Sequence, residues 1–214
     1  MSRNSPARFR QRFLTILRLG AEDRSRKKVQ GKFYISGITP ETVMFMERTI
    51  LILAEDMYDD RELWYPAIRM KEEGYRVLFV GTGVKKTFHS KNGLPVTVDH
   101  EASEIDFPFD ALIVPGGYAP DRLRRFPGIL ALVKRAYEEK RIVGTICHGA
   151  WVLISAGIVH GKRMTCFSAI KDDLVNAGAN YVDEGVVRDG NIITSRTPND
   201  LHLFGRAIID AIEE

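Results

Sequence analysis

The sequence predicts an α/β fold, a doubly wound and mostly parallel sheet sandwiched by helices. Short continuous apolar runs, such as residues 49–54 (TILILA) and 111–114 (ALIV), are typical of strands buried on both faces. Helical stretches alternate with these runs, as the crossover connections of a parallel sheet require. The 214 residues, 44% of them hydrophobic, suffice for one such domain with its own core.

The predicted elements follow one another along the chain. Buried strands are expected at residues 49–54, 75–80, 111–114 and 142–146. Helical patterns run through Leu63, Ile68 and Met70 to Gly74 with Pro66 as a kink or restart, over residues 129–139 and 151–156, and from Thr197-Pro198 to Ile212. The dipeptides Asn92-Gly93 and Asp189-Gly190 predict hairpins within residues 85–100 and 186–194.

The net charge of +3 is unevenly distributed. Residues 1–48 hold 11 Lys and Arg against four Asp and Glu, a net of +7, which leaves −4 for the remainder. Such asymmetry indicates a boundary, so we expect a basic N-terminal extension over residues 1–48 and an α/β domain over residues 49–214. No apolar run approaches the roughly 18 residues of a membrane-spanning helix.

The extension allows three interpretations. Apolar residues between Phe9 and Leu17 fit one helical stripe opposite the arginines, and Arg18 interrupts the run that a secretory signal would need. The segment is an arm that docks on this chain or a second subunit, a surface helix for membrane or nucleic acid, or an Arg-rich transit peptide. Further on, residues 32–36 predict a short strand, and residues 39–48 predict a helix begun by Thr39 and Pro40.

Cys147 is the first candidate for reactive chemistry. The strand at residues 142–146 (IVGTI) runs directly into Cys147-His148-Gly149 and a helix, so Cys147 is expected on a sharp turn with the geometry of a nucleophile elbow. A helix N-terminus favours a thiolate, His148 is adjacent, and Gly149 leaves room for close approach. A buried inert cysteine is the alternative, but the strand-end position and the neighbouring His favour a reactive thiol.

Two further strand ends carry polar groups. Gly116 and Gly117 follow residues 111–114, where their backbone N–H groups are expected near an oxyanion, with a plain turn as the alternative. Five carboxylates follow the first strand: Glu55, Asp56, Asp59, Asp60 and Glu62. A solvated face usually explains such a run, but at the carboxyl edge of a sheet one carboxylate can hydrogen-bond the sulfur or hold its proton.

Cys166 lacks both a helix start and a neighbouring His, so we expect it in the core. The sequence has no HxxH, HExxH or CxxC pattern, and therefore no metal is expected. It also has neither GxGxxG nor a P-loop, and no nucleotide or other cofactor is expected.

Five stretches in one order resemble the PfpI family of intracellular proteases and deglycases. The matching stretches are AEDMYDDRELWYP (54–66), ALIVPGGYAPDRLR (111–124), TICHGAWVLISAG (145–157), IKDDLVNAGA (170–179) and SRTPNDL (195–201). The resemblance covers residues 49 to about 212. It implies the flavodoxin-like fold of the class I glutamine-amidotransferase-like superfamily, with a nucleophile elbow.

The resemblance also implies roles for particular residues. Cys147 would be the nucleophile and His148 its partner. Asp121 would be the third member of the triad, supplied from a neighbouring subunit, which implies a homo-oligomer with Asp121 near the interface. Asp59 occupies the position where the family usually carries a Glu that hydrogen-bonds the cysteine. Gly117 and the backbone at His148 would form the oxyanion hole.

The function expected on this basis is a cysteine-dependent hydrolase whose substrate is a peptide or a small carbonyl compound, as in a glyoxalase or deglycase. The alternative is a non-enzymatic redox sensor or stress chaperone with an oxidisable Cys147. Glutamine amidotransfer would need a downstream His-x-Glu, which is absent. A DNA-binding regulator would need an added helix-turn-helix, so no nucleic acid partner is expected. A cytoplasmic location is expected.

Overall fold

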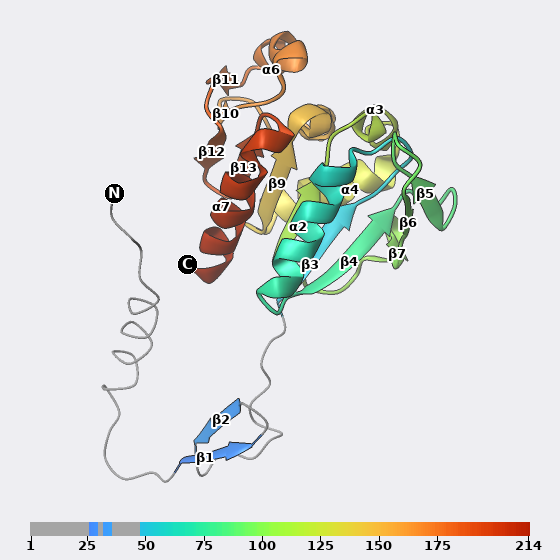
Figure 1. Ribbon diagram of the computed structural model, residues 1–214. Helices are drawn as coiled ribbons and strands as arrows, with labels where there is room; N and C mark the ends of the chain where they lie inside the picture. Colours follow the sequence, from blue (N-terminus) through green and yellow to red (C-terminus); the bar gives the residue numbers. More distant parts are fainter. Residues whose placement is uncertain (1–25, 30–31, 36–47) are drawn as a thin grey trace. The chain divides into compact units, whose positions relative to one another are not determined.

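The structure, a computed structural model, describes residues 26–29, 32–35 and 48–214 (Figure 1). The chain divides into two units, Met1–Met46 and Glu47–Glu214, which we describe separately. In the first unit, β1 (Arg26–Val29) pairs antiparallel with β2 (Lys32–Ile35), which is the strand expected at residues 32–36. The apolar stripe within residues 9–17 and all but the last residue of the helix expected at 39–48 lie outside the described residues.

The second unit is built on a seven-stranded sheet in the order β12-β13-β9-β8-β3-β4-β7. Its strands are β3 (Thr49–Leu53), β4 (Arg76–Gly81), β7 (His100–Glu101), β8 (Ala111–Val114), β9 (Ile142–Ile146), β12 (Val186–Asp189) and β13 (Ile192–Ser195). All pairings are parallel except that of β12 with β13. The mostly parallel sheet that the apolar runs predict is confirmed, and every residue of β3, β8 and β9 is buried.

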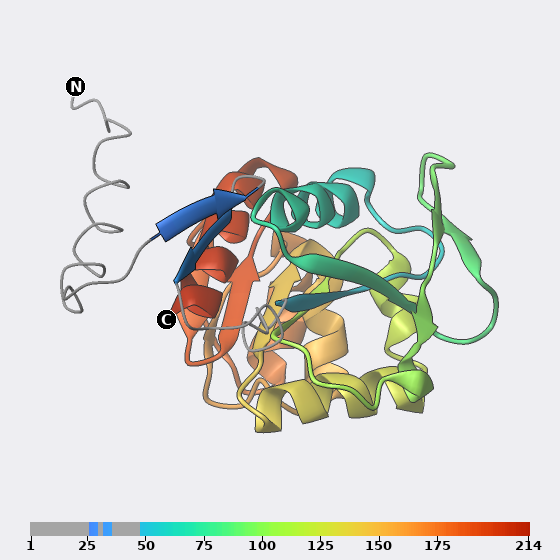
Figure 2. The ribbon, with the colours of Figure 1, turned by 90° about the horizontal axis from the view of Figure 1, so that it is seen from below.

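Helices cover both faces of this sheet, as Figures 1 and 2 show. On one face α2 (Asp60–Glu72) and α7 (Leu201–Glu213) pack side by side, and on the other α4 (Pro127–Glu138) packs against α5 (Ala150–Ser155). Gly144 of β9 permits the close approach of α7, because a Cβ there would lie 2.9 Å from Ile208 Cδ1. Two short helices, α3 (Ala119–Leu123) and α6 (Lys171–Asn176), pack against α5.

Both predicted hairpins are present. The pair β5 (Thr87–His89) and β6 (Pro95–Thr97) flanks the turn at Asn92-Gly93, and β12 and β13 flank Asp189-Gly190. A small parallel pair is formed by β10 (Arg163–Met164) and β11 (Asn180–Tyr181). Pro66 lies inside α2, which continues through it without ending or restarting. No helix of the described residues combines the length and apolar character needed to cross a bilayer.

Candidate active site

Cys147 lies on a sharp turn between β9 and the following helix. The strand ends at Ile146, and a 3-10 helix, η3 (Cys147–Gly149), begins at once and leads into α5. Cys147 adopts a φ of 60°, a left-handed conformation that a non-glycine residue holds only at a cost in strain. Gly149 makes the turn sterically possible, since a Cβ there would lie 2.6 Å from the Val114 carbonyl oxygen. This is the elbow geometry that the sequence predicts.

His148 lies against the thiol of Cys147. The distance from Cys147 Sγ to His148 Nδ1 is 3.3 Å, and the cysteine is only 8% exposed. The imidazole packs among the rings of Tyr118, Trp151 and Phe167. Burial lowers the pKa of His148, and the nearby charge of Lys91 lowers it further. The imidazole is therefore neutral near pH 7 and can accept or relay a proton.

Glu62 is the carboxylate that faces Cys147. It projects from the inner side of α2, is 1% exposed, and accepts a hydrogen bond of 2.9 Å from the Gly116 N–H through Oε2. Burial, reinforced by the negative charge of Asp59, raises the pKa of Glu62 to about 7. The Cys147 thiol and the Gly116 N–H hold this pKa below what burial alone would give. Glu62 can therefore exist in either protonation state near neutral pH.

The Cys147 thiol holds its proton strongly. Burial raises the pKa of Cys147 to about 12, and the negative charge of Glu62 contributes to the rise. The backbone N–H groups of His148 and Gly117 point at the sulfur and oppose it. The sequence led us to expect a thiolate stabilised by the helix start; the structure differs because burial and Glu62 outweigh that effect. Loss of the thiol proton is therefore coupled to the protonation state of Glu62.

Asp59 does not occupy the position beside the sulfur that the resemblance implies. It is the N-cap of α2, where Oδ1 accepts hydrogen bonds from Arg61 N–H (3.0 Å) and Glu62 N–H (3.3 Å). Its Oδ2 forms an ion pair of 2.6 Å with Lys91. Burial alone would raise the pKa of Asp59, but Lys91 and the two N–H groups together lower it. An N-cap side chain turns to the free N–H groups of its own helix, which leaves Glu62 to face the thiol.

The sequence contained a signal for this arrangement. The spacing of Asp59 and Glu62 is that of a capping box, in which the first residue caps the helix. Glu62 also shares the buried side of α2 with the residues spaced three and four apart along it: Leu63, Pro66, Ala67 and Met70. A carboxylate on an otherwise apolar, inward-facing stripe is a stronger candidate for the site than one at the helix start.

The remaining carboxylates hold neighbouring loops in place. Glu55 accepts a hydrogen bond from Thr82 Oγ1 (2.6 Å), and Asp56 forms an ion pair with Lys85. Asp60 accepts hydrogen bonds of 2.6 Å from both Ser90 and Asn92 at the β5–β6 hairpin. None of these contacts involves the thiol.

Gly116 and Gly117 have separate tasks. Gly117 has a φ of 78°, and a Cβ there would lie 2.6 Å from the Met57 carbonyl oxygen, so only glycine fits. Its N–H points at the Cys147 sulfur together with that of His148. The N–H of Gly116 is bound to Glu62, which makes Gly116 a positioning residue and not the oxyanion donor that the sequence led us to expect.

Asp121 makes no contact with Cys147, His148 or Glu62, although its helix α3 packs beside the turn at Cys147–Gly149. It is in the first turn of α3, about half exposed, and ion-paired with Arg125. Within residues 48–214 no carboxylate contacts the His148 ring.

The described residues also contain no group of three or more His, Cys, Asp or Glu side chains arranged to hold a metal ion. Cys166 is buried, as the sequence predicts.

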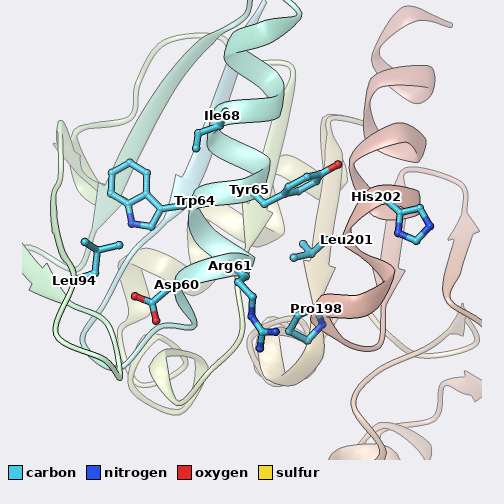
Figure 3. Close-up of a pocket in the computed structure, with 9 residues that line it drawn as sticks. All are labelled: Asp60, Arg61, Trp64, Tyr65, Ile68, Leu94, Pro198, Leu201 and His202. Carbon is cyan, nitrogen blue, oxygen red and sulfur yellow. The ribbon is translucent and has the colours of Figure 1, made fainter.

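A largely apolar hollow of about 520 Å³ lies on the opposite side of α2 from Glu62. Figure 3 shows Trp64, Tyr65 and Ile68 of α2 on one side of it and Leu201 and His202 of α7 on the other. The helix that carries Glu62 therefore has one face toward the thiol and another on this hollow.

Comparison with known proteins identifies the family. The model of the DJ-1/PfpI family matches residues 48–211, which include every residue of the site. The chain belongs to the DJ-1/PfpI family. This confirms the resemblance drawn from the five sequence stretches.

Relatives in this family are similar over the whole α/β domain. Deglycase PYRAB04690 of Pyrococcus abyssi is 42% identical over 165 residues, which are 77% of this chain and 99% of that protein. Deglycase PfpI of Pyrococcus furiosus is 39% identical over the same shares of the two chains. YraA of Bacillus subtilis, provisionally named a cysteine protease, is 39% identical over 78% of this chain and 100% of that protein.

A solved structure with similar sequence shares the fold. It is a two-domain protein from Anabaena variabilis with DJ-1/ThiJ/PfpI-like and ferritin-like domains, at 39% identity and a TM-score of 0.76. The match covers 78% of this chain, and the chain spans 48% of that larger protein.

Proposed function

We propose that this chain is a cysteine-dependent hydrolase of the deglycase or glyoxalase type, with Cys147 as the nucleophile. The observation that carries the proposal is the Cys147 thiol held at a strained elbow between Glu62 and His148, with the N–H groups of Gly117 and His148 directed at it. A nucleophile, a proton acceptor and oxyanion donors in contact are what addition to a carbonyl requires. The deglycase names of relatives about 40% identical support this reaction class.

The proposed chemistry begins when the Cys147 sulfur adds to the aldehyde carbon of an α-oxoaldehyde. The C–S bond forms, the C=O π pair moves onto oxygen, and the thiol proton passes to the Glu62 carboxylate. The N–H groups of Gly117 and His148 hold the resulting oxyanion, which then takes up a proton. Transfer of the hydrogen on this carbon to the neighbouring carbonyl carbon as a proton, relayed by Glu62 or His148, gives a thioester. Water cleaves the thioester into a 2-hydroxy acid and the free thiol, so the net reaction is addition of one water.

The geometry favours a small substrate over a peptide. Cys147 is 8% exposed, and the His148 ring beside it packs against the rings of Trp151 and Phe167. An extended peptide backbone needs an open groove, whereas an aldehyde carbon on a small molecule or on a flexible side-chain adduct can reach an occluded thiol. The name of YraA keeps peptide hydrolysis as the second candidate.

We further propose that the protein works as a homo-oligomer in which Asp121 of one subunit orients His148 of another. The support is twofold. His148 has no carboxylate partner within residues 48–214, and Asp121 is half exposed on a short helix adjacent to the site. A neutral imidazole that takes up a proton during turnover becomes an imidazolium. A carboxylate that accepts a hydrogen bond from its second nitrogen orients the ring and stabilises this charged form.

The test compares methylglyoxal consumption and hydrolysis of a fluorogenic peptide for the native chain, Cys147→Ala and Cys166→Ala. We expect the native chain and Cys166→Ala to consume methylglyoxal at similar rates and Cys147→Ala to be inactive. Peptide hydrolysis that depends on Cys147, without methylglyoxal consumption, would move the assignment to the peptidase. Equal and negligible rates for all three proteins with both substrates would contradict the hydrolase.

A further inference from the structure

A second pocket lies at the end of the sheet opposite Cys147. It has a volume of about 440 Å³ and opens where β9 and β13 begin, whereas Cys147 follows the end of β9. We call it the distal pocket, and the lining residues that matter here are Tyr137, Lys140, Lys162, Arg188, Asn191 and Glu214.

Three cations from separate segments converge on this pocket. The Lys140 and Lys162 ammonium groups lie 5.5 and 5.7 Å from the centre of one aromatic ring, that of Tyr137. Arg188 comes from β12. Glu214 is the one acid that lines the pocket, and Asp189 beside it binds Lys162 at 3.3 Å. The lining therefore carries an excess of positive charge, and within residues 48–214 no carboxylate forms an ion pair with Lys140.

The backbone at Lys140 is unusual for a lysine. It has a φ of 61°, and it follows α4 at the position where helices commonly end in a left-handed glycine. Its N–H donates to the Tyr137 carbonyl, and the Arg141 N–H donates to the Ala136 carbonyl, which completes that ending. Glycine would satisfy the same hydrogen bonds without strain. Lysine at this position does not stabilise the end of α4 better than glycine would. What the lysine side chain adds is an ammonium group beside the pocket.

Arg188 already binds a carboxylate in the geometry that an external anion would adopt. Its Nη1 and Nη2 donate to the two oxygens of the Glu214 carboxylate at 2.6 and 2.8 Å, the parallel fork by which a guanidinium binds a planar anion. Asn191 fixes the opposite wall by donating to the Tyr137 and Arg141 carbonyls. The Glu214 side chain is 62% exposed, so an external anion can reach Arg188 and compete with this carboxylate for it.

We propose that the distal pocket is a binding site for a small dianion, a phosphate ester or a dicarboxylate, held by Lys140, Lys162 and Arg188. Displacement of Glu214 frees Arg188, and Arg188 together with Lys140 then matches a dianion in charge, while Lys162 is shared with Asp189. The ring of Tyr137 offers an apolar surface beside these groups. The site is separate from Cys147, and it does not depend on the reaction proposed there.

The experiment titrates the full chain with inorganic phosphate and with malonate by calorimetry, at an ionic strength fixed with sodium chloride. The variants are Lys140→Gly, Glu214→Gln and, as a control that removes one lysine charge from the preceding helix α4, Lys134→Ala. We expect saturable binding that Lys140→Gly weakens by about tenfold or more, the loss of one charge-assisted hydrogen bond. Glu214→Gln should strengthen it, and Lys134→Ala should change it by less than about twofold because Lys134 lies outside the pocket.

Thermal unfolding separates loss of binding from loss of folding. Lys140→Gly should melt at or above the temperature of the native chain, because glycine is favoured at a left-handed position. Binding of phosphate alone supports a phosphate ester, and binding of malonate as well supports a general dianion site. The proposal is overturned if neither ligand saturates the native chain and Glu214→Gln, or if Lys134→Ala and Lys140→Gly weaken binding equally.

Discussion

At the scale of single residues, the chemistry proposed for this protein depends on the proton that Glu62 and Cys147 can exchange. Both groups are buried, and each resists a second negative charge beside it. Nucleophilic sulfur therefore appears only when the proton moves to a neighbour, which links attack on a substrate to proton transfer. Such coupling lets a mostly neutral thiol act as a nucleophile near pH 7.

Replacement of Glu62 by Gln should change the pH dependence of stability. The pKa of Glu62 rises from 4.5 to about 7 on folding, so the folded chain binds this proton more tightly than the unfolded chain between these values. The free energy of unfolding should therefore fall as pH rises through this window, by up to about 3 kcal/mol relative to Glu62→Gln. Urea unfolding of both proteins from pH 4 to 8 measures it. A difference that stays constant with pH would contradict the raised pKa.

The sequence located Cys147 but chose the wrong carboxylate. A strand running directly into a helix is a local pattern, so the elbow at Cys147 follows from neighbouring residues alone. Asp59 and Glu62 are three positions apart in one acidic run, and the composition of this run does not indicate which of the two faces the thiol. What separates them is the residue at which α2 begins, since the side chain of that residue binds the free N–H groups of the first turn. Element boundaries are the least certain part of a sequence-based prediction.

At the scale of elements, the position of α2 determines where Glu62 lies relative to the Cys147 thiol. Its start is fixed by the Asp59 side chain, the Lys91 ion pair and the Gly116 N–H bond to Glu62. A change at any of these three points should act on activity through the position of Glu62. Asp59, Lys91 and Gly116 are therefore positioning residues, whereas Glu62 is the residue proposed to exchange protons with the substrate.

Asp59→Asn and Asp59→Ala distinguish a cap from a proton carrier. Asparagine caps helices as well as aspartate does, so Asp59→Asn should keep the helix start but lose the Lys91 ion pair, and it should be clearly more active toward methylglyoxal than Asp59→Ala. Asp59→Ala should lose about 1–2 kcal/mol of stability and much of the activity, because Glu62 loses its fixed position. Steady-state rates and chemical denaturation of both variants measure this. Equal inactivity of the two variants, with both folded, would instead assign the Asp59 carboxylate to the chemistry.

Gly116→Ala should disturb the site while a matched glycine substitution does not. A Cβ on Gly116 would lie 2.8 Å from Cys147 Cβ and even closer to the Glu62 carboxylate. On Gly128, in α4, the nearest atom to an added Cβ is 4.0 Å away. We expect Gly116→Ala to lose most of its activity, and Gly128→Ala to remain active and gain up to about 1 kcal/mol from its helix propensity. Activity of Gly116→Ala at the native level would show that the site tolerates displacement of Glu62.

At the scale of the whole molecule, the two ends of the sheet carry different chemistry. The carboxyl ends of β3, β8 and β9 gather the thiol and its partners, as open α/β sheets generally do. The opposite end holds the distal pocket, assembled from the ends of α4 and α7 and from β12. Its cations Lys140, Lys162 and Arg188 are separated by 22 and 26 residues along the chain, so no local sequence pattern indicates that they meet. The parallel sheet itself was predictable because each buried strand is visible as a run of apolar residues.

Mixing two inactive variants tests whether Asp121 acts across an interface. Cys147→Ala lacks the nucleophile, and Asp121→Ala should lack the group that orients His148 in its neighbour. If subunits exchange at random in a dimer, an equal mixture should regain about a quarter of the native activity, since half the dimers contain one complete site. Rates measured before and after mixing, with size-exclusion chromatography to record the assembly, decide the matter. An active Asp121→Ala variant would remove this residue from the mechanism.

Pro66 gives the helix that carries Glu62 a property of its own. Proline has no N–H, so the carbonyl of Glu62, four residues earlier, receives no hydrogen bond within α2. The first turn is consequently fastened less firmly to the rest of the helix, and it can open without unfolding the domain. Amide hydrogens of residues 61–65 should exchange with solvent faster than those of residues 67–72, by mass spectrometry after deuterium labelling. Brief openings of this turn would give a side chain that is 1% exposed a way to exchange its proton with water. The proline would then influence the rate at which the Glu62 carboxyl group exchanges its proton with water between turnovers, while burial determines the pKa of that group.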